Sequence, residues 1–211
     1  MKTTQILLIS AVLLSASGAV QAALFDRGGG LIYDDDLNVT WLANANYGAG
    51  SVYDDHASST DGRMSWANAV SWAANLSYYD SVRNVTYTDW RLPVNINILS
   101  SVTEIDHLLY TELGGNAWNS ILTTHNANYF LFQNIQDDVY WSNTSSIACL
   151  GFGTHYSCSA GTAHPYNESI GLYAWAVRPG DVAAVPVPAA AWLLGSGLLG
   201  LTGFSRKHRT E

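Results

Sequence analysis

Two uncharged apolar segments near the ends of the 211-residue chain divide it into three parts. The first part has a basic start at Lys2, the apolar run Ile6–Val20, and small residues up to Ala22 that suit signal peptidase. This pattern predicts a signal peptide over residues 1–22. The alternative is a retained anchor, which is disfavoured because the run is shorter than the roughly 20 residues that span a bilayer.

The last part, residues 185–211, has the pattern of a membrane-spanning helix followed by a basic tail. Val185 to Phe204 contains no charged residue, and the basic segment Ser205–Arg209 follows directly. Twenty helical residues span roughly 30 Å, one hydrocarbon core, although Pro186 and Pro188 leave a helix of about 24 Å. Export of the middle part would keep the basic tail inside the cell, in agreement with the positive-inside rule.

This tail resembles the PEP-CTERM class of bacterial sorting signals. The resemblance rests on Val185-Pro186-Val187-Pro188, on the apolar helix with Trp192, and on the arginines that follow. It implies a Gram-negative bacterium that makes exopolysaccharide, with an exosortase as the processing partner. Val187 occupies the place of the Glu that names the class. A permanent membrane anchor is the alternative fate of the tail.

Between these parts, residues 23–184 form a single predicted domain with an acidic charge. It holds five arginines, no lysine and sixteen acidic residues, for a net charge of −11. Such a domain is repelled by nucleic acid and by polyanionic glycans or lipids, so nucleic acid is excluded as a partner. Neutral sugars, divalent cations or basic proteins fit better. Its many Trp and Tyr rings serve either the core or a sugar-binding surface.

The two cysteines, Cys149 and Cys158, predict a disulfide because an exported pair of this kind is oxidised. Closing a loop of about ten residues contributes roughly 3 kcal/mol in the chain-entropy model. Ring side chains in and just after this loop are the predicted ligand-contacting residues, from loop position and side-chain type. They are His155, Tyr156, His164 and Tyr166.

The first half of the domain predicts a hairpin and a helix. The β-prone runs Leu31–Tyr33 and Val39–Trp41 flank the acidic segment Asp34–Asn38, which suits a turn. Its acidic spacing is similar to the start of a calcium loop, but the Gly and Glu of an EF-hand are missing. Calcium is therefore possible but unsupported, and no cofactor is assigned. Apolar residues at helical spacing predict a helix from an N-cap at Ser65 to Leu76. Its predicted apolar face consists of Trp66, Ala69, Val70, Ala73 and Leu76.

A second helix is predicted from a capping box formed by Ser101 and Glu104, ending at Gly114-Gly115. Its apolar stripe is Ile105, Leu108, Leu109 and Leu113. After Asn116 the pattern changes to short aromatic runs that predict strands. These runs are Tyr129–Phe132, Val139–Trp141 and Tyr173–Val177. The predicted class is α+β with two main helices, short antiparallel strands, long loops and the C-terminal transmembrane helix.

The order of several motifs along residues 24–181 is similar to the Lcl C-terminal domain family, named for the end domain of a bacterial collagen-like adhesin. The motifs are Trp41-Leu42, Asp61–Trp66, Asp89-Trp90-Arg91-Leu92-Pro93, Tyr140–Ser142 and Ala176–Gly180. The resemblance implies a compact, C-type-lectin-like domain at the cell surface, with adhesion to glycans. By physical reasoning alone, the Asp89–Pro93 motif suits a scaffold: Trp90 and Leu92 enter the core, and Arg91 pairs with Asp89 or Glu104.

Recognisable catalytic motifs are absent from the sequence, and no catalytic or metal-binding residue is assigned. The histidines are scattered, with no two at metal-ligand spacing on one element. The adjacent acid pairs Asp54-Asp55 and Asp137-Asp138 suit solvated turns better than a glycosidase pair. The leading hypothesis is a non-enzymatic surface or matrix protein that binds glycan, held by the membrane through its C-terminal helix during sorting and then displayed at the cell surface. The alternatives are a polymer-modifying enzyme and a structural protein without a ligand.

Overall fold

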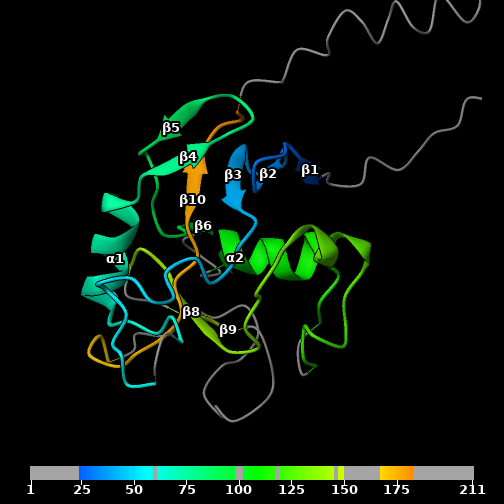
Figure 1. Ribbon diagram of the computed structural model, residues 1–211. Coiled ribbons are helices and arrows are strands. Elements are labelled where there is room, and N and C mark those ends of the chain that lie inside the picture. The colour runs from blue at the N-terminus through cyan, green and yellow to red at the C-terminus, as the bar shows by residue number, and fades with distance from the viewer. Residues whose placement is uncertain are drawn as a thin grey trace, which may run out of the picture.

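A four-stranded antiparallel sheet organises the fold, in the order β1-β2-β3-β10. Figure 1 shows the computed structural model, which describes residues 24–58, 61–97, 102–116, 119–144, 147–149 and 167–182. The strands are β1 (Leu24–Asp26), β2 (Leu31–Asp34), β3 (Val39–Leu42) and β10 (Val177–Pro179). The predicted hairpin is confirmed as β2–β3. Because β10 pairs with β3, the end of the described chain closes onto its beginning.

Alternation along the strands divides the hydrophobic core into two parts, one on each face of the sheet. Ile32 pairs with Trp41, and both side chains belong to the first core cluster. Leu31 pairs with Leu42, and these belong to the second cluster. Successive side chains of a strand point to opposite faces, so one hairpin supplies both clusters.

The first helix, α1 (Trp66–Asn75), covers the second core cluster. Its predicted N-cap is confirmed: the Ser65 side chain accepts a hydrogen bond from the Asn68 N–H at 3.4 Å. The predicted apolar face was wrong in one position, because Val70 is 37% exposed whereas Trp72 is 4% exposed. The helix is rotated so that the larger aromatic side chain is buried, which gains more apolar area than burying a valine.

The second helical segment packs on the first core cluster. It consists of α2 (Glu104–His107) and the π-helix η1 (Leu108–Glu112). The predicted apolar stripe is confirmed as buried: Ile105, Leu108, Leu109 and Leu113. The predicted capping box was wrong, because Thr103 is the N-cap and Asp106 completes the box. Glu104 therefore has no capping role and is paired elsewhere.

The second half contains fewer strands than the aromatic runs predict. Val139–Trp141 is strand β8, as predicted, and it pairs with β9 (Ile147–Cys149). The strand predicted at Tyr129–Phe132 was wrong: Ala127–Leu131 forms the 3₁₀ helix η2, capped by the Asn126 side chain. A capping Asn favours a helical turn because its side-chain oxygen satisfies a free backbone N–H.

In the run Tyr173–Val177, regular pairing begins only at Val177. Tyr173 makes an isolated bridge with Tyr140. Two further hairpins complete the described fold, with the following bounds: β4 (Tyr78–Asp80) with β5 (Val85–Tyr87), and β6 (Asn95–Asn97) with β7 (Val102–Thr103). Figure 1 shows α1 at the left edge and α2 below the β1–β3 strands. The described chain is thus α+β, with two helices and antiparallel strands.

Among the described residues, no helix is long and apolar enough to cross a membrane. The predicted signal peptide over residues 1–22 and the predicted span within 185–211 both lie outside the described residues, and so does the Val185–Pro188 motif. These parts remain predictions.

Candidate functional site

The Asp89–Pro93 motif joins three parts of the core. Trp90 is 3% exposed and Leu92 is 2% exposed, so both enter the second core cluster. The Arg91 backbone forms a two-way bridge with Val177, with both N–H···O distances at 2.9 Å. The motif therefore connects β10 to the segment that leads into the second helix.

The Arg91 side chain pairs with Glu104. Its two guanidinium nitrogens lie 2.6 and 2.8 Å from the Glu104 oxygens, and the Val94 N–H donates to the same carboxylate at 2.9 Å. A bidentate pair of this kind is a strong and directional contact. Of the two partners that the sequence left open for Arg91, the structure selects Glu104.

Asp89 pairs instead with Arg178, with both N–H···O distances at 2.9 Å. The hydrogen bonds from Arg178 hold the pKa of the Asp89 carboxyl below its ordinary value. The Arg178 guanidinium also lies 4.3 Å from the centre of the Tyr87 ring. These contacts agree with a scaffold role for the motif.

The four predicted ligand-contacting residues, His155, Tyr156, His164 and Tyr166, lie outside the described residues. Cys158 does as well. The backbone of Cys149 pairs with Val139 in the β8–β9 ladder. The disulfide and the ligand-contacting set remain predictions.

A cluster of three rings forms a candidate ligand surface that the sequence did not single out. His125 stacks on Tyr129, with ring centres 4.0 Å apart and planes at 11°. Phe130 stands nearly perpendicular to both rings, at 5.3 Å and 5.6 Å. Phe130 is 75% exposed, the largest value among the described aromatic residues that are exposed. We call His125, Tyr129 and Phe130 the aromatic cluster.

The aromatic cluster is held by amide side chains. Asn126 and Asn128 donate to the backbone carbonyl of Glu112 at 2.8 and 3.0 Å, which fixes the loop against the end of the second helix. The signal that could have revealed this arrangement is the Asn126 cap, because it predicts a short helical turn that brings His125, Tyr129 and Phe130 together. Interpreting Tyr129–Phe132 as a strand concealed it.

The predicted solvated turn at Asp54-Asp55 was wrong for Asp54, which is 3% exposed. Burial raises its pKa, but backbone N–H groups of Gly50, His56 and Gly62 outweigh this effect and leave the pKa below its ordinary value. Ligand atoms of Asp54, Asp55 and Asp61 lie within 4.8 Å of one another. The three N–H groups already satisfy Asp54, so this arrangement organises the loop.

Asp137-Asp138 also departs from the predicted solvated turn. Asp138 forms an ion pair with Arg63, whose guanidinium lies 4.9 Å from the centre of the Tyr173 ring. One buried oxygen of Asp137, Oδ1, has no hydrogen-bond partner. Asp138 therefore belongs to the packing around Arg63.

A third acidic group is buried between the hairpin and the second helix. Asp34, on β2, is fully buried, and its ligand atoms lie within 4.8 Å of those of His107 and Glu112. Burial, together with the charges of Asp34, Asp36 and Asp35, raises the pKa of Glu112 to about 7. Burial also raises the pKa of Asp34. We call Asp34, His107 and Glu112 the buried triad.

Comparison with known proteins does not assign this chain to a family. A scan of protein-family models gave no match, and neither did searches of curated proteins and of solved structures. Function is therefore argued from the residues themselves.

Proposed function

We propose that this chain is an exported cell-surface or exopolysaccharide-matrix protein whose lectin-like domain binds neutral glycan without chemical turnover. The observation that carries the proposal is the aromatic cluster with its exposed Phe130. The predicted signal peptide, exosortase-type processing and membrane-spanning tail supply the route to the surface. The resemblance to the Lcl C-terminal domain family supports the lectin-like fold and adhesion to glycans.

The aromatic cluster has the chemistry that a sugar ring requires. A pyranose has an apolar face that stacks on an aromatic ring and hydroxyl groups that need polar partners. Phe130 offers the ring and Tyr129 beside it a phenolic hydroxyl, while Asn126 and Asn128 hold the segment through the Glu112 carbonyl. A ring left 75% exposed has most of its apolar area available for burial by a ligand.

The charge of the domain selects among glycans. With a net charge of −11 over residues 23–184, the domain repels acidic polysaccharides at long range. Neutral hexose polymers carry no such penalty. The proposed ligand is therefore a neutral stretch of exopolysaccharide, with His155, Tyr156, His164 and Tyr166 as proposed further contacts.

The test compares two exposed aromatic residues by binding of the purified chain to arrayed neutral glycans and to host exopolysaccharide. Phe130→Ala is expected to weaken binding about 10- to 100-fold, since burying a phenyl ring is worth about 1.5–3 kcal/mol. Tyr79→Ala is the matched control, because Tyr79 is 58% exposed on β4, outside the cluster. Equal losses in both variants would contradict the assigned surface, and absence of glycan binding by the wild type would favour the structural alternative.

A further inference from the structure

The buried triad has unsatisfied polar atoms that the rest of the described fold does not explain. Both carboxylate oxygens of Glu112 and the Nε2 atom of His107 are buried without a hydrogen-bond partner. The Glu112 side chain is 1% exposed, and its Oε1 lies 3.3 Å from His107 Nε2. Buried polar groups in native proteins are almost always satisfied, so a carboxylate with both oxygens unpartnered indicates a missing partner.

The backbone is specialised to bring these side chains together. Glu112 lies five positions after His107, and in a regular α-helix side chains at that spacing point about 140° apart. Here the segment widens into the π-helix Leu108–Glu112, closed by a hydrogen bond from the Leu113 N–H to the Leu108 carbonyl at 2.8 Å. π-helical turns of this kind are rare and are frequent at functional sites. The wider turn aims Glu112 at His107.

The third member comes from the sheet. Asp34 shares the face of β2 that carries Ile32, and so it points from a buried position toward the second helix. Its oxygens accept hydrogen bonds from the Leu37 N–H at 3.1 Å and from the Trp41 indole at 3.5 Å. Contacts of this kind orient a ligand side chain from outside the coordination sphere.

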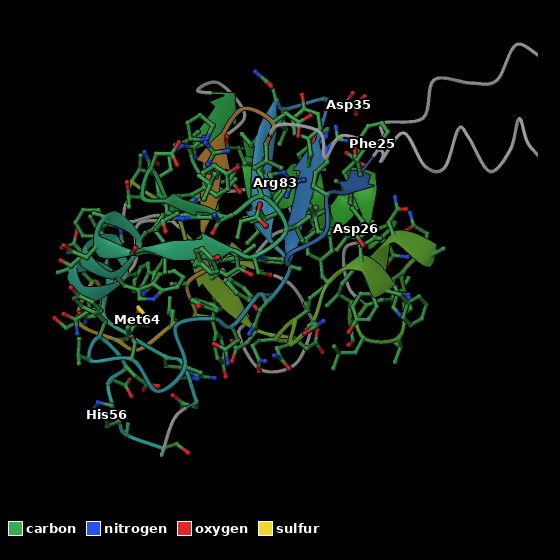
Figure 2. All side chains as sticks on the ribbon, turned by 45° about the horizontal axis from the view of Figure 1, so that its top comes forward. Phe25, Asp26, Asp35, His56, Met64 and Arg83 are labelled. Carbon is green, nitrogen blue, oxygen red and sulfur yellow. The ribbon has the colours of Figure 1, made fainter. Side chains whose placement is uncertain are left out.

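Asp36 lies at the solvent side of the triad, beside His107. Its Oδ2 lies 3.7 Å from His107 Nε2, and its side chain is 45% exposed. Figure 2 shows the neighbouring Asp35 at one end of the molecule and His56, beside the Asp54 loop, at the other. The two acidic groups are therefore separate sites.

We propose that Asp34, His107 and Glu112 bind one divalent transition-metal ion of the zinc class, with a water molecule in the fourth position. Around a tetrahedral ion with bonds of about 2.0–2.2 Å, neighbouring ligand atoms lie about 3.3–3.6 Å apart. The separation of 3.3 Å between Glu112 Oε1 and His107 Nε2 falls in that range, and the ligand atoms of all three residues lie within 4.8 Å of one another. The imidazole ligand favours Zn²⁺ over Ca²⁺ and Mg²⁺, which prefer oxygen alone.

A metal accounts for the unpaired carboxylate better than general acid catalysis does. A Glu with a raised pKa is a familiar proton donor, but it must reach its substrate within hydrogen-bond distance. The Glu112 side chain is 1% exposed, so a polymer chain cannot approach it, whereas a single ion can enter beside Asp36 and His107. This inference does not depend on glycan binding.

The experiment measures metal binding by the purified, chelator-treated full chain. Zn²⁺ is quantified after equilibrium dialysis, and Co²⁺ is used as a spectroscopic probe, because low-coordinate Co²⁺ has intense visible d–d bands. The wild type is expected to bind one tight equivalent of Zn²⁺ and to develop these bands. Glu112→Gln and His107→Gln are each expected to weaken that equivalent at least ~100-fold, since even outer-shell changes cost 10- to 100-fold.

The matched control is Asp55→Asn, because Asp55 belongs to the other convergent acidic group and is exposed. It is expected to keep the tight equivalent and the Co²⁺ bands. Unchanged binding in either Glu112→Gln or His107→Gln, where that variant folds, would overturn the proposal, and so would loss of the tight equivalent in Asp55→Asn. Displacement of Zn²⁺ by equimolar Ca²⁺ would overturn the assignment of the metal class. The two variants change one buried and one part-exposed ligand, so they do not carry the same risk of unfolding. Either variant that folds decides whether the metal site exists.

Discussion

Glu104 and Glu112 lie at the two ends of one helical segment, and both are buried, yet their surroundings differ completely. Glu104 is 4% exposed and has the Arg91 guanidinium and the Val94 N–H as partners. Glu112 is 2% exposed, and neither of its oxygens has a hydrogen-bond partner. Two glutamates buried to nearly the same extent thus differ: Glu104 has hydrogen-bond partners and Glu112 has none.

The difference separates a structural carboxylate from a binding carboxylate. A buried charge is stable when its partner is part of the fold, as Arg91 is for Glu104. Around Glu112 the fold supplies other acids, Asp34 and Asp36, and one imidazole, His107, so the charge needs a proton, on Glu112 or on His107, or an external cation. The raised pKa of Glu112, about 7, reflects the cost of ionising this buried carboxyl group beside other acids.

Removing the partner of Glu104 is the largest perturbation in this comparison. Arg91→Leu leaves a buried carboxylate with only the Val94 N–H, and it is expected to lower the free energy of unfolding by roughly 2–4 kcal/mol. Urea denaturation at pH 7 measures this loss. The double variant Arg91→Leu with Glu104→Leu is the control, and it should recover part of the stability. A loss below about 0.5 kcal/mol in the single variant would show that the pair is no more than a surface ion pair.

In the presence of chelator, neutralising Glu112 is expected to raise the free energy of unfolding, whereas Arg91→Leu lowers it. A carboxyl group whose folded pKa lies above its ordinary 4.5 binds its proton more tightly in the folded state. The wild type therefore loses stability as the pH rises from 4.5 to about 7, by up to roughly 3 kcal/mol. Asp34, Asp35, Asp36 and His107 are the charged groups that face it.

Glu112→Gln removes this titration and should be more stable than the wild type above pH 7, while the two proteins converge near pH 4. Thermal unfolding across pH 4 to pH 8 with chelator measures the difference. Glu104→Gln is the matched control, because its carboxylate has partners and no such gain is expected. Parallel pH profiles for the wild type and Glu112→Gln would show that Glu112 carries no buried charge.

The sequence predicts the parts of this comparison that depend on local pattern. The β2–β3 hairpin follows from β-prone runs around a turn, and the Ser65 cap and the stripe from Ile105 to Leu113 follow from capping and helical spacing; the structure confirms all three. The pairing of Arg91 with a carboxylate can also be predicted, because an arginine between the core residues Trp90 and Leu92 requires a partner of opposite charge. The choice of Glu104 over Asp89 depends on tertiary placement, which spacing alone does not give.

The buried triad escapes sequence reasoning for two physical reasons. His107 and Glu112 are brought together only by the π-helical turn, and no propensity distinguishes a π turn from an α turn here. Asp34 belongs to an acidic segment that resembles an exposed turn, although strand alternation places it on the same face as the buried Ile32. That alternation was the available signal.

The Asp89–Arg178 pair provides the weakest test, since it is an ion pair at the surface rather than in the core. The Asp89 side chain is 47% exposed, so Asp89→Asn is expected to cost only about 0.2–1 kcal/mol at pH 7. Arg178 lowers the folded pKa of Asp89 below its ordinary 3.8, so this contribution is present above that pH and is lost as the pH falls through the lower, folded value. Chemical denaturation at pH 7 and at progressively lower pH should therefore show a small difference that shrinks as the carboxylate becomes protonated. Added salt should shrink it as well, whereas the Arg91–Glu104 pair, whose carboxylate is buried, should respond less. An Asp89→Asn loss as large as that of Arg91→Leu would mean that burial does not set the strength of these two pairs.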